Sequence, residues 1–487
     1  MVDQFAVRRV IGFLNPLDMG PDRRVLLGEE FGEEVLLLRR ADDEDAARVC
    51  DRFRDILEER LVLLGPVAGP LLMGVNVAND VGVTPLYLAC TNRNAAMVQK
   101  LLDAQANPNA TLSSGETVLM NCARAGEVGA VMALLAHGAS VNAKEPSHGQ
   151  TALMWAAAQR HPQVAEALVD HGADVQARSR IYNQIVTSEV TQRAGREELN
   201  YTVPRGGSTP LLFAARSGDV DSARVLLAAG ADVNDALPDG TSALVLAAHS
   251  GNGAVAALLL DKGADPNAAT AGYTALHAAV LRADLDLVKA LLAHGANPSA
   301  PITKGTPVRR LSQDFELPKT LIGATPYLLA AKYLEVKMML VLAGAGADTR
   351  LAMKDGTTPL MASAGVGADV SADRRGLTVF DGGKMAEESR VVEAVTATLD
   401  LGADINAVNR AGDTALHGAA SLGYDRVVQL LADKGAQLSV KNGRGQTPLA
   451  ALTRGRGQAA GTGAAALPRQ IAHPSTADLL RKLGAVE

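Results

Sequence analysis

Aromatic residues and cysteines are scarce in this sequence of 487 residues. Aromatics make up 3% of the chain, although hydrophobic residues reach 47% and glycines number 47. A large aromatic core is therefore excluded, and the many small residues favour thin, closely packed layers. Three cysteines without a C-x-x-C spacing exclude a fully paired disulfide framework, so we expect Cys50, Cys90 and Cys122 to be reduced thiols.

The chain also lacks a net positive charge and long apolar runs. A net charge of -6 gives no basic field that would attract nucleic acid or an anionic membrane, so neither is an expected partner. No apolar run approaches the roughly 18 residues of a membrane helix. The first apolar run is short and broken at Asn15 and Pro16, which does not fit an export signal. The chain as written therefore predicts a cytoplasmic protein.

An internal repeat dominates the rest of the sequence. A Thr or Ser, then a small residue or Pro, then usually Leu, recurs as in TALMWAA and TPLLFAA. The ten copies begin at Thr84, Thr117, Thr151, Thr209, Ser242, Thr274, Thr325, Thr358, Thr414 and Thr447. Six of the nine steps share a period of about 33 residues, and the other three are longer by about 20 residues. The longer steps predict whole repeats that carry insertions.

The motif, its LLxxGAD-like ending and its spacing resemble the ankyrin-repeat family, whose unit of about 33 residues is a β-turn followed by two antiparallel helices. The resemblance begins near Asn76 and continues to the end of the chain, and the order and insertions are most similar to bacterial members. It implies an all-α solenoid of about ten helix-turn-helix repeats with three insertions. It also implies a monomeric, non-enzymatic scaffold that binds a protein partner through its concave face. The alternative is a regulatory module that binds a small ligand in a pocket formed by the insertions.

The recurring positions of each unit have structural explanations. Each opening Thr can cap the first helix by accepting a hydrogen bond from a backbone N–H. Gly126, Gly218, Gly251 and Gly423 each follow their Thr or Ser by nine positions, where a helix must end in a left-handed conformation. Because one unit cannot bury its own apolar face, stability is expected to come from stacked neighbours.

The histidines and catalytic motifs do not indicate an active site. His277 and His417 take the fourth position of TALH, where the resemblance implies hydrogen bonds that tie helix to turn. Equivalent positions of stacked repeats lie on the order of 10 Å apart, whereas ligands of one metal ion lie about 2 Å from it. GGKMA at 382–386 lacks the earlier glycine and the following Ser or Thr of a phosphate loop. We expect no metal, no cofactor and no enzymatic activity.

The sequence divides into an N-terminal segment, 1–74, and a repeat domain, 75–487. The segment contains no Lys, Ser or Thr and carries 15 acidic against 10 basic residues. Two alternatives remain for it: a helical cap, for which 41–61 has amphipathic spacing, or a gene start assigned in a wrong reading frame that replaces an export signal. The second alternative would place the protein in the periplasm or outside the cell. Insertions are expected near 178–207, 300–322 and 368–389, a flexible stretch at 454–474, and a final helix starting at Ser475 or Thr476.

Six residues are candidates for partner binding. Trp155 and Phe213 are the only aromatics at the fifth position of a repeat, which in ankyrin repeats borders the concave groove. They flank the first insertion, which carries Tyr182 and Tyr201, and basic residues follow on neighbouring helix ends. Aromatic residues and Arg dominate the energetics of many interfaces. The candidates are Trp155, Phe213, Tyr182, Tyr201, Arg216 and His249.

Overall fold

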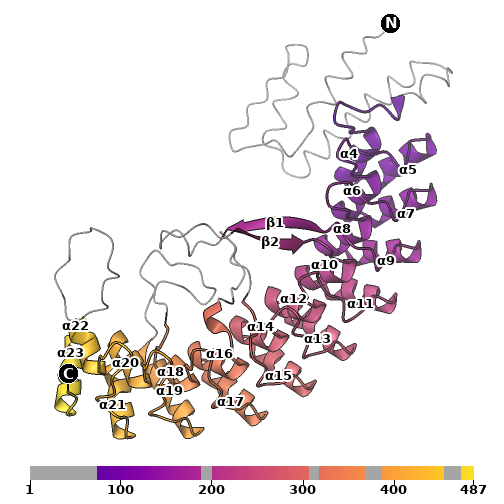
Figure 1. Cartoon of the computed structure of the whole chain (residues 1–487). Coiled ribbons are helices and arrows are strands. Elements are labelled where there is room, and N and C mark those ends of the chain that lie inside the picture. Colours follow the sequence, from indigo (N-terminus) through magenta and orange to yellow (C-terminus); the bar gives the residue numbers. More distant parts are fainter. Residues whose placement is uncertain are drawn as a thin grey trace, which may run out of the picture. The chain divides into compact units, whose positions relative to one another are not determined.

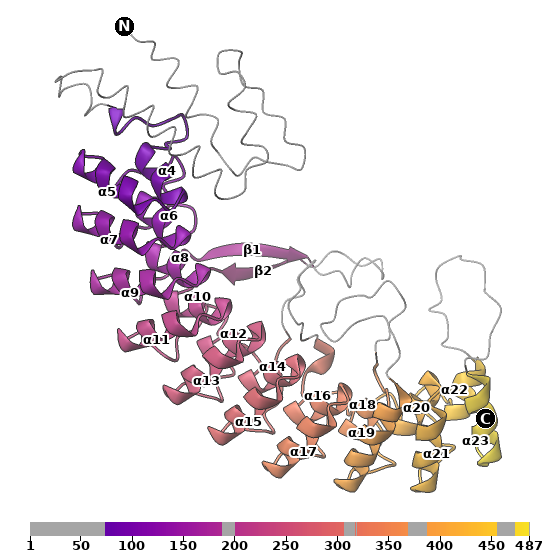
Figure 2. The same cartoon turned by 180° about the vertical axis from the view of Figure 1, so that it is seen from behind.

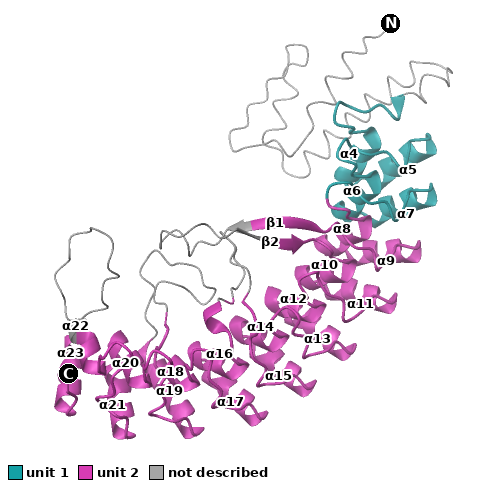
Figure 3. Cartoon of the chain, in the orientation of Figure 1, with its two compact units in different colours: residues 1–147 teal, residues 148–487 magenta. Residues whose placement is uncertain are grey.

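The computed structural model of this chain describes residues 74–187, 200–305, 317, 319–368, 387–454 and 473–486. They fall into two compact units, residues 1–147 and 148–487, which are coloured separately in Figure 3. Three features named above lie outside the described part: the amphipathic stretch at 41–61, the side chain of Tyr201, and most of the predicted flexible stretch at 454–474. The same holds for the centre of the third insertion.

Helices in antiparallel pairs make up both units, and the first helix of each pair begins at the repeated Thr or Ser (Figure 1). We call these first helices the inner helices. In unit 1 they are α4 (Pro85–Thr91) and α6 (Val118–Ala125). In unit 2 they are α8 (Ala152–Gln159), α10 (Pro210–Ser217), α12 (Ala243–Ser250), α14 (Ala275–Arg282), α16 (Pro326–Lys332), α18 (Pro359–Ser363), α20 (Ala415–Leu422) and α22 (Pro448–Arg454).

The second helices of the pairs, the outer helices, form a row within each unit. In unit 1 they are α5 (Ala95–Asp103) and α7 (Val128–Ala136). In unit 2 they are α9 (Pro162–Asp170), α11 (Val220–Ala228), α13 (Gly253–Asp261), α15 (Leu285–Ala293), α17 (Val336–Gly344), α19 (Glu388–Asp400), α21 (Asp425–Asp433) and α23 (Pro474–Lys482). Within unit 2, each inner helix packs on the next inner helix and each outer helix on the next outer one, as the reverse view in Figure 2 also shows. The predicted all-α repeat solenoid is confirmed.

Hydrogen bonds at the helix ends follow the sequence pattern. The Thr151, Thr209 and Thr325 hydroxyls each accept from the backbone N–H three positions later. Gly126, Gly218, Gly251 and Gly423 end their helices with φ between 73° and 81°, the left-handed region that glycine enters without a Cβ clash. The final helix α23 starts at Pro474, one position before the predicted start.

His277 makes the hydrogen bond to its own N-terminal turn that the family resemblance implied, and it also reaches the next repeat. Its Nδ1 accepts from the backbone N–H of Thr274 at 3.1 Å, and its Nε2 lies 3.3 Å from the carbonyl oxygen of Ala324 in the following repeat. The Thr274 hydroxyl also lies 2.9 Å from the same Nδ1, so this Thr contacts the imidazole through two groups. Burial of the fully enclosed ring lowers the pKa of His277 to about 4.

The expectation of reduced thiols is wrong for two of the three cysteines. Cys90 in α4 and Cys122 in α6 form a disulfide, with their Cα atoms 4.8 Å apart and both residues fully buried. Their separation in sequence is close to the repeat period, which brings them face to face across two contacting inner helices. The two small side chains are buried where α4 and α6 meet, close enough to be bonded. Cys50 lies outside the described residues.

The insertions enter the array at different places. The first forms a hairpin of β1 (Tyr182–Thr187) and β2 (Asn200–Arg205) between α9 and α10. The described end of the second contains the short helix η4 (Lys319–Leu321), which precedes α16. The third lies between α18 and α19, the two helices of a single pair. The hairpin is therefore a local β element in an otherwise helical array.

The burial of His277 predicts a pH-dependent stability. The imidazole is neutral in the fold and titrates near 6.5 when unfolded, so its contribution is complete above pH 6.5 and is lost as the pH falls toward 4. A difference of about 2.5 pKa units corresponds to about 3 kcal/mol. In denaturant titrations at pH 7 and pH 4, His277→Gln should lose about 3 kcal/mol less than the unaltered protein. The exposed His294→Gln serves as control, and equal losses in all three proteins would contradict the prediction.

Candidate functional site

Trp155 and Phe213 lie on neighbouring inner helices that pack against each other. Trp155 belongs to α8 and Phe213 to α10, and α8 packs against α10. Each aromatic side chain is half-buried, and the residues directly before and after it in the helix are buried. The indole nitrogen of Trp155 is itself buried, so the exposed part of this side chain is apolar ring. The structure therefore brings two partly exposed aromatic surfaces onto adjacent helices, as the fifth-position pattern predicted.

The hairpin beside these helices presents further apolar side chains. The backbone of Tyr182 pairs with Arg205 and that of Tyr201 with Val186, which places the two tyrosines at opposite ends of the ladder. Tyr182 is 48% exposed, while Ile185 on the other face of the same strand is 68% exposed. Ile181 precedes the strand and is also exposed. Figure 1 shows the hairpin on the inner-helix side of unit 2, the side on which α8 and α10 also lie.

A buried carboxylate fixes the base of the hairpin to the next repeat. Asp235, 3% exposed, pairs with the Arg178 guanidinium and accepts from the hydroxyl of Thr209, the N-cap of α10. Arg178 also donates to the carbonyl oxygens of Gly207 at 2.9 Å and Ala236 at 3.2 Å. Bonds between charged groups and several partners hold a segment firmly. This network, which we call the Arg178–Asp235 clamp, connects both ends of the insertion to the following turn.

Arg216 and His249 lie in the last turns of α10 and α12, which pack together. Arg216 is exposed, and its backbone carbonyl accepts from the side-chain amide of Asn252 at 2.9 Å. The His249 ring lies 6.1 Å from the ring of Tyr273, and Arg282 of α14 donates from Nε to the His249 carbonyl oxygen at 2.7 Å. The two predicted basic residues thus join a longer row that includes Arg282.

Sequence reasoning missed several residues of this surface. Ile181 and Ile185 were hidden in an insertion whose short alternating stretches, YNQIVT and NYTVPR, are weak strand signals beside the repeats. The Arg178–Asp235 clamp joins residues 57 positions apart, and no local pattern indicates such a pair. Arg282 follows from the repeat register only when the basic residues at the ends of the first helices are compared between copies.

Unit 1 carries a separate polar cluster on its inner helices. The Tyr87 hydroxyl donates to Glu116 at 3.0 Å, and Arg124 pairs with Glu116 at 3.2 Å. Burial and the neighbouring Glu116 carboxylate raise the pKa of Tyr87 to about 12. A phenol that holds its proton so firmly is unsuited to act as a base or nucleophile near neutral pH. The cluster is arranged as a structural network.

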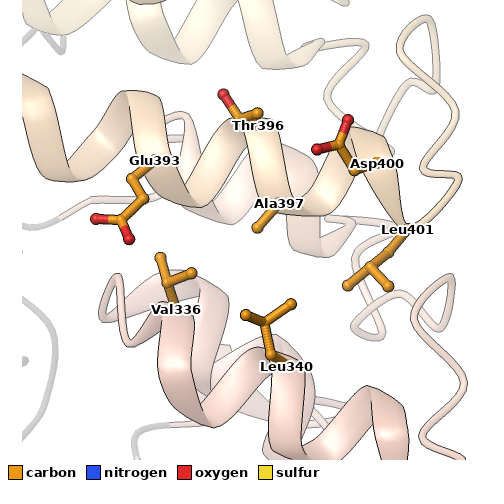
Figure 4. Close-up of a pocket in the computed structure, with 7 residues that line it drawn as sticks. All are labelled: Val336, Leu340, Glu393, Thr396, Ala397, Asp400 and Leu401. Atoms are coloured by element: carbon orange, nitrogen blue, oxygen red, sulfur yellow. The ribbon is translucent and has the colours of Figure 1, made fainter.

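Two shallow hollows in unit 2 are lined by residues outside the predicted insertions. The first lies between α17 and α19 and contains Leu340, Thr396 and Leu401, with the carboxylates of Glu393 and Asp400 at its edges (Figure 4). The second includes Arg350 and Asp404. Neither resembles an apolar cavity with converging polar groups, the usual form of a small-ligand site. Over the described ranges, no group of three His, Cys, Asp or Glu residues could hold a metal ion, and no helix is long and apolar enough to cross a bilayer.

Family models of ankyrin repeats match several parts of the chain. The model for three copies matches residues 86–179 and 211–302, the model for many copies matches 155–227, and the single-repeat model matches 411–443. These segments follow the helix pairs of both units.

Named relatives cover only part of the chain. Human ankyrin repeat and SOCS box protein 16 is 32% identical over 277 residues, covering 55% of this chain and 52% of that protein. Protein PhlB of Serratia liquefaciens is 47% identical over 64 residues, 13% of this chain and 28% of that protein. The crystal structure of the human ASB11 ankyrin repeat domain matches with a TM-score of 0.39 and 20% identity over 54% of this chain and 99% of that domain. The chain thus spans about half the length of the first curated relative and a smaller share of the second.

The Arg178–Asp235 clamp predicts a coupling between array stability and hairpin order. Asp235→Ala removes the acceptor of the bonds from Arg178, Thr209 and the backbone N–H of Ala236, and should lower the free energy of unfolding by about 2 kcal/mol. Trypsin should also cleave faster after Arg180 and Arg205, at the two ends of the hairpin. Asp286→Ala, at a 98% exposed carboxylate, removes the same charge as a control. Equal cleavage rates in the two variants would show that the clamp does not hold the hairpin.

Proposed function

Because the chain belongs to the ankyrin-repeat family, whose members are protein-interaction modules, we propose that it is a non-enzymatic scaffold that binds a protein partner through the inner-helix face of unit 2. The observation that carries the proposal is the pair of half-buried aromatics, Trp155 and Phe213, on the contacting helices α8 and α10. Aromatics are rare in this chain, and inner helices elsewhere place small or aliphatic residues, or one Asn, at the same position.

The surroundings of the pair support a protein partner over a small molecule. The hairpin that precedes α10 adds the exposed side chains of Ile181, Tyr182 and Ile185. Together they make an apolar centre, and Arg216 and His249 on the following helix ends supply a polar edge. An apolar centre with aromatic anchors and a polar rim is the usual anatomy of a protein interface. Origin from a bacterium stays a prediction, since the named relatives come from both human and Serratia liquefaciens.

Binding should depend strongly on the two aromatic rings. The partner would be recovered on the immobilised full chain from the source organism, purified, and its affinity measured by titration calorimetry. Trp155→Ala combined with Phe213→Ala should weaken binding by about 30-fold or more, the equivalent of one lost hot spot of about 2 kcal/mol. Helix content and melting temperature should stay nearly unchanged, because both rings are only half-buried.

A matched variant separates an interface effect from general loss of apolar surface. Leu340→Ala with Met132→Ala removes two exposed apolar side chains from the outer helices α17 and α7. This control should bind the partner with unaltered affinity. Unchanged affinity in the aromatic double variant would reject the anchor role, and a collapsed melting temperature would show that the rings serve packing.

A further inference from the structure

A disulfide joins the two inner helices of unit 1 at positions that alanine fills in other repeats. Cys90 is the seventh residue of the repeat that begins at Thr84, and Cys122 is the sixth residue of the next repeat. At several equivalent contacts of unit 2, both positions are buried alanines: Ala157 with Ala214, Ala215 with Ala247, and Ala248 with Ala279. Packing alone is therefore satisfied by alanine, and cysteine on both sides of one contact adds a covalent bond that packing does not require.

Polar side chains beside the disulfide hold the same two helices in register. Asn121 directly precedes Cys122 in α6. Its side-chain amide donates to the carbonyl oxygen of Tyr87 and to the hydroxyl of Thr91 in α4, each at 2.9 Å. These bonds do not involve sulfur, so the repeat fold itself brings the two thiols together. The resulting Cα–Cα distance of 4.8 Å lies within the range that a disulfide spans.

Burial distinguishes this pair from a pair of redox-active cysteines. Cys90 and Cys122 are both 0% exposed. Cysteines that cycle between thiol and disulfide are partly exposed, because the attacking thiolate must reach the sulfur. A reductant can reach this bond only after the contact between α4 and α6 has opened.

From these observations we infer that Cys90–Cys122 is a permanent cross-link, made in an oxidising compartment, that keeps the first repeat of unit 1 attached to the second. Structural disulfides persist in such compartments and are rare where thiols are kept reduced. The two thiols lose two protons and two electrons to a disulfide-bonded oxidant, which leaves as a pair of thiols. The inference contradicts the cytoplasmic expectation, and it does not depend on the partner surface of unit 2.

The effect of the cross-link should be local. Each repeat of such an array contacts only its neighbours, so one contact can open while the others stay closed. The disulfide joins residues 32 positions apart and restricts the conformations that the opened segment can adopt. It therefore acts mainly on α4 and on α5, which packs against α4.

The state of the two thiols in the source organism tests the compartment. A culture is quenched in acid and dissolved in denaturant with N-ethylmaleimide, which blocks every free thiol, including buried ones. Trypsin without reductant then leaves the two cysteines in separate peptides, 61–93 and 101–124. Mass spectrometry should detect these peptides joined in most chains. Alkylated cysteines in most chains would overturn the inference.

Reduction of the purified full chain tests whether the bond is permanent. Cys50→Ala leaves Cys90 and Cys122 as the only cysteines, so thiols released from the bond can be counted with Ellman's reagent. With reduced glutathione at neutral pH, the folded variant should release thiols about tenfold more slowly, or slower still, than in guanidinium. Equal rates would show a labile bond and would overturn its permanence.

Hydrogen exchange tests the local effect. Cys90→Ala with Cys122→Ala places at both positions the residue that equivalent contacts carry. Amides of α4 and α5 should exchange several-fold faster in this variant, and those of α12 and α13 in unit 2 should be unaltered. The matched control is the unaltered sequence, reduced in denaturant and refolded with reductant, which keeps both sulfur atoms and lacks the bond. It should exchange as fast as the variant, whereas exchange as slow as in the oxidised chain would show that the bond does not hold the repeat.

Discussion

Contact between successive inner helices is the constraint on which the rest of this protein depends. A pair of short helices cannot bury its own apolar face, so each repeat is completed by the next one. The contact requires small residues, and the alanine pairs of the inner helices, such as Ala214 with Ala215 and Ala278 with Ala279, are almost completely buried. The scarcity of aromatics follows directly, because a large ring at these positions would hold neighbouring helices apart.

Thin layers make the boundaries between repeats the place where buried polar groups are satisfied. His277 reaches the Ala324 carbonyl of the next repeat, and His417 reaches the Gln446 carbonyl at 3.1 Å. Asp235 pairs with Arg178, which precedes the hairpin, and accepts a hydrogen bond from Thr209, which follows it. An unpaired polar group in such a position would cost the free energy of its desolvation. These bonds therefore fix the order and register of repeats whose apolar contacts are much alike.

The sequence predicts the repeats well because their signals are local and occur many times. Each Thr cap and each glycine with positive φ marks one helix end. The regular spacing of the motif then places Trp155 and Phe213 on adjacent inner helices. Features that occur once were missed. The hairpin, the Arg178–Asp235 clamp and the Cys90–Cys122 disulfide all join distant residues, and a single sequence contains no second copy that would reveal their register.

Close packing also determines where this array can carry specificity. In α14, every residue from Ala275 to Leu281 is buried, and only Arg282 at the end of the helix reaches the surface. A substitution at the last position changes the charge of the inner face without altering the core, whereas a change within the helix disturbs two neighbours. Trp155 and Phe213 are half-buried, so their rings also reach the surface of the inner helices. Under the proposed function, a few side chains per repeat, at the spacing that helix packing imposes, would distinguish one partner from another.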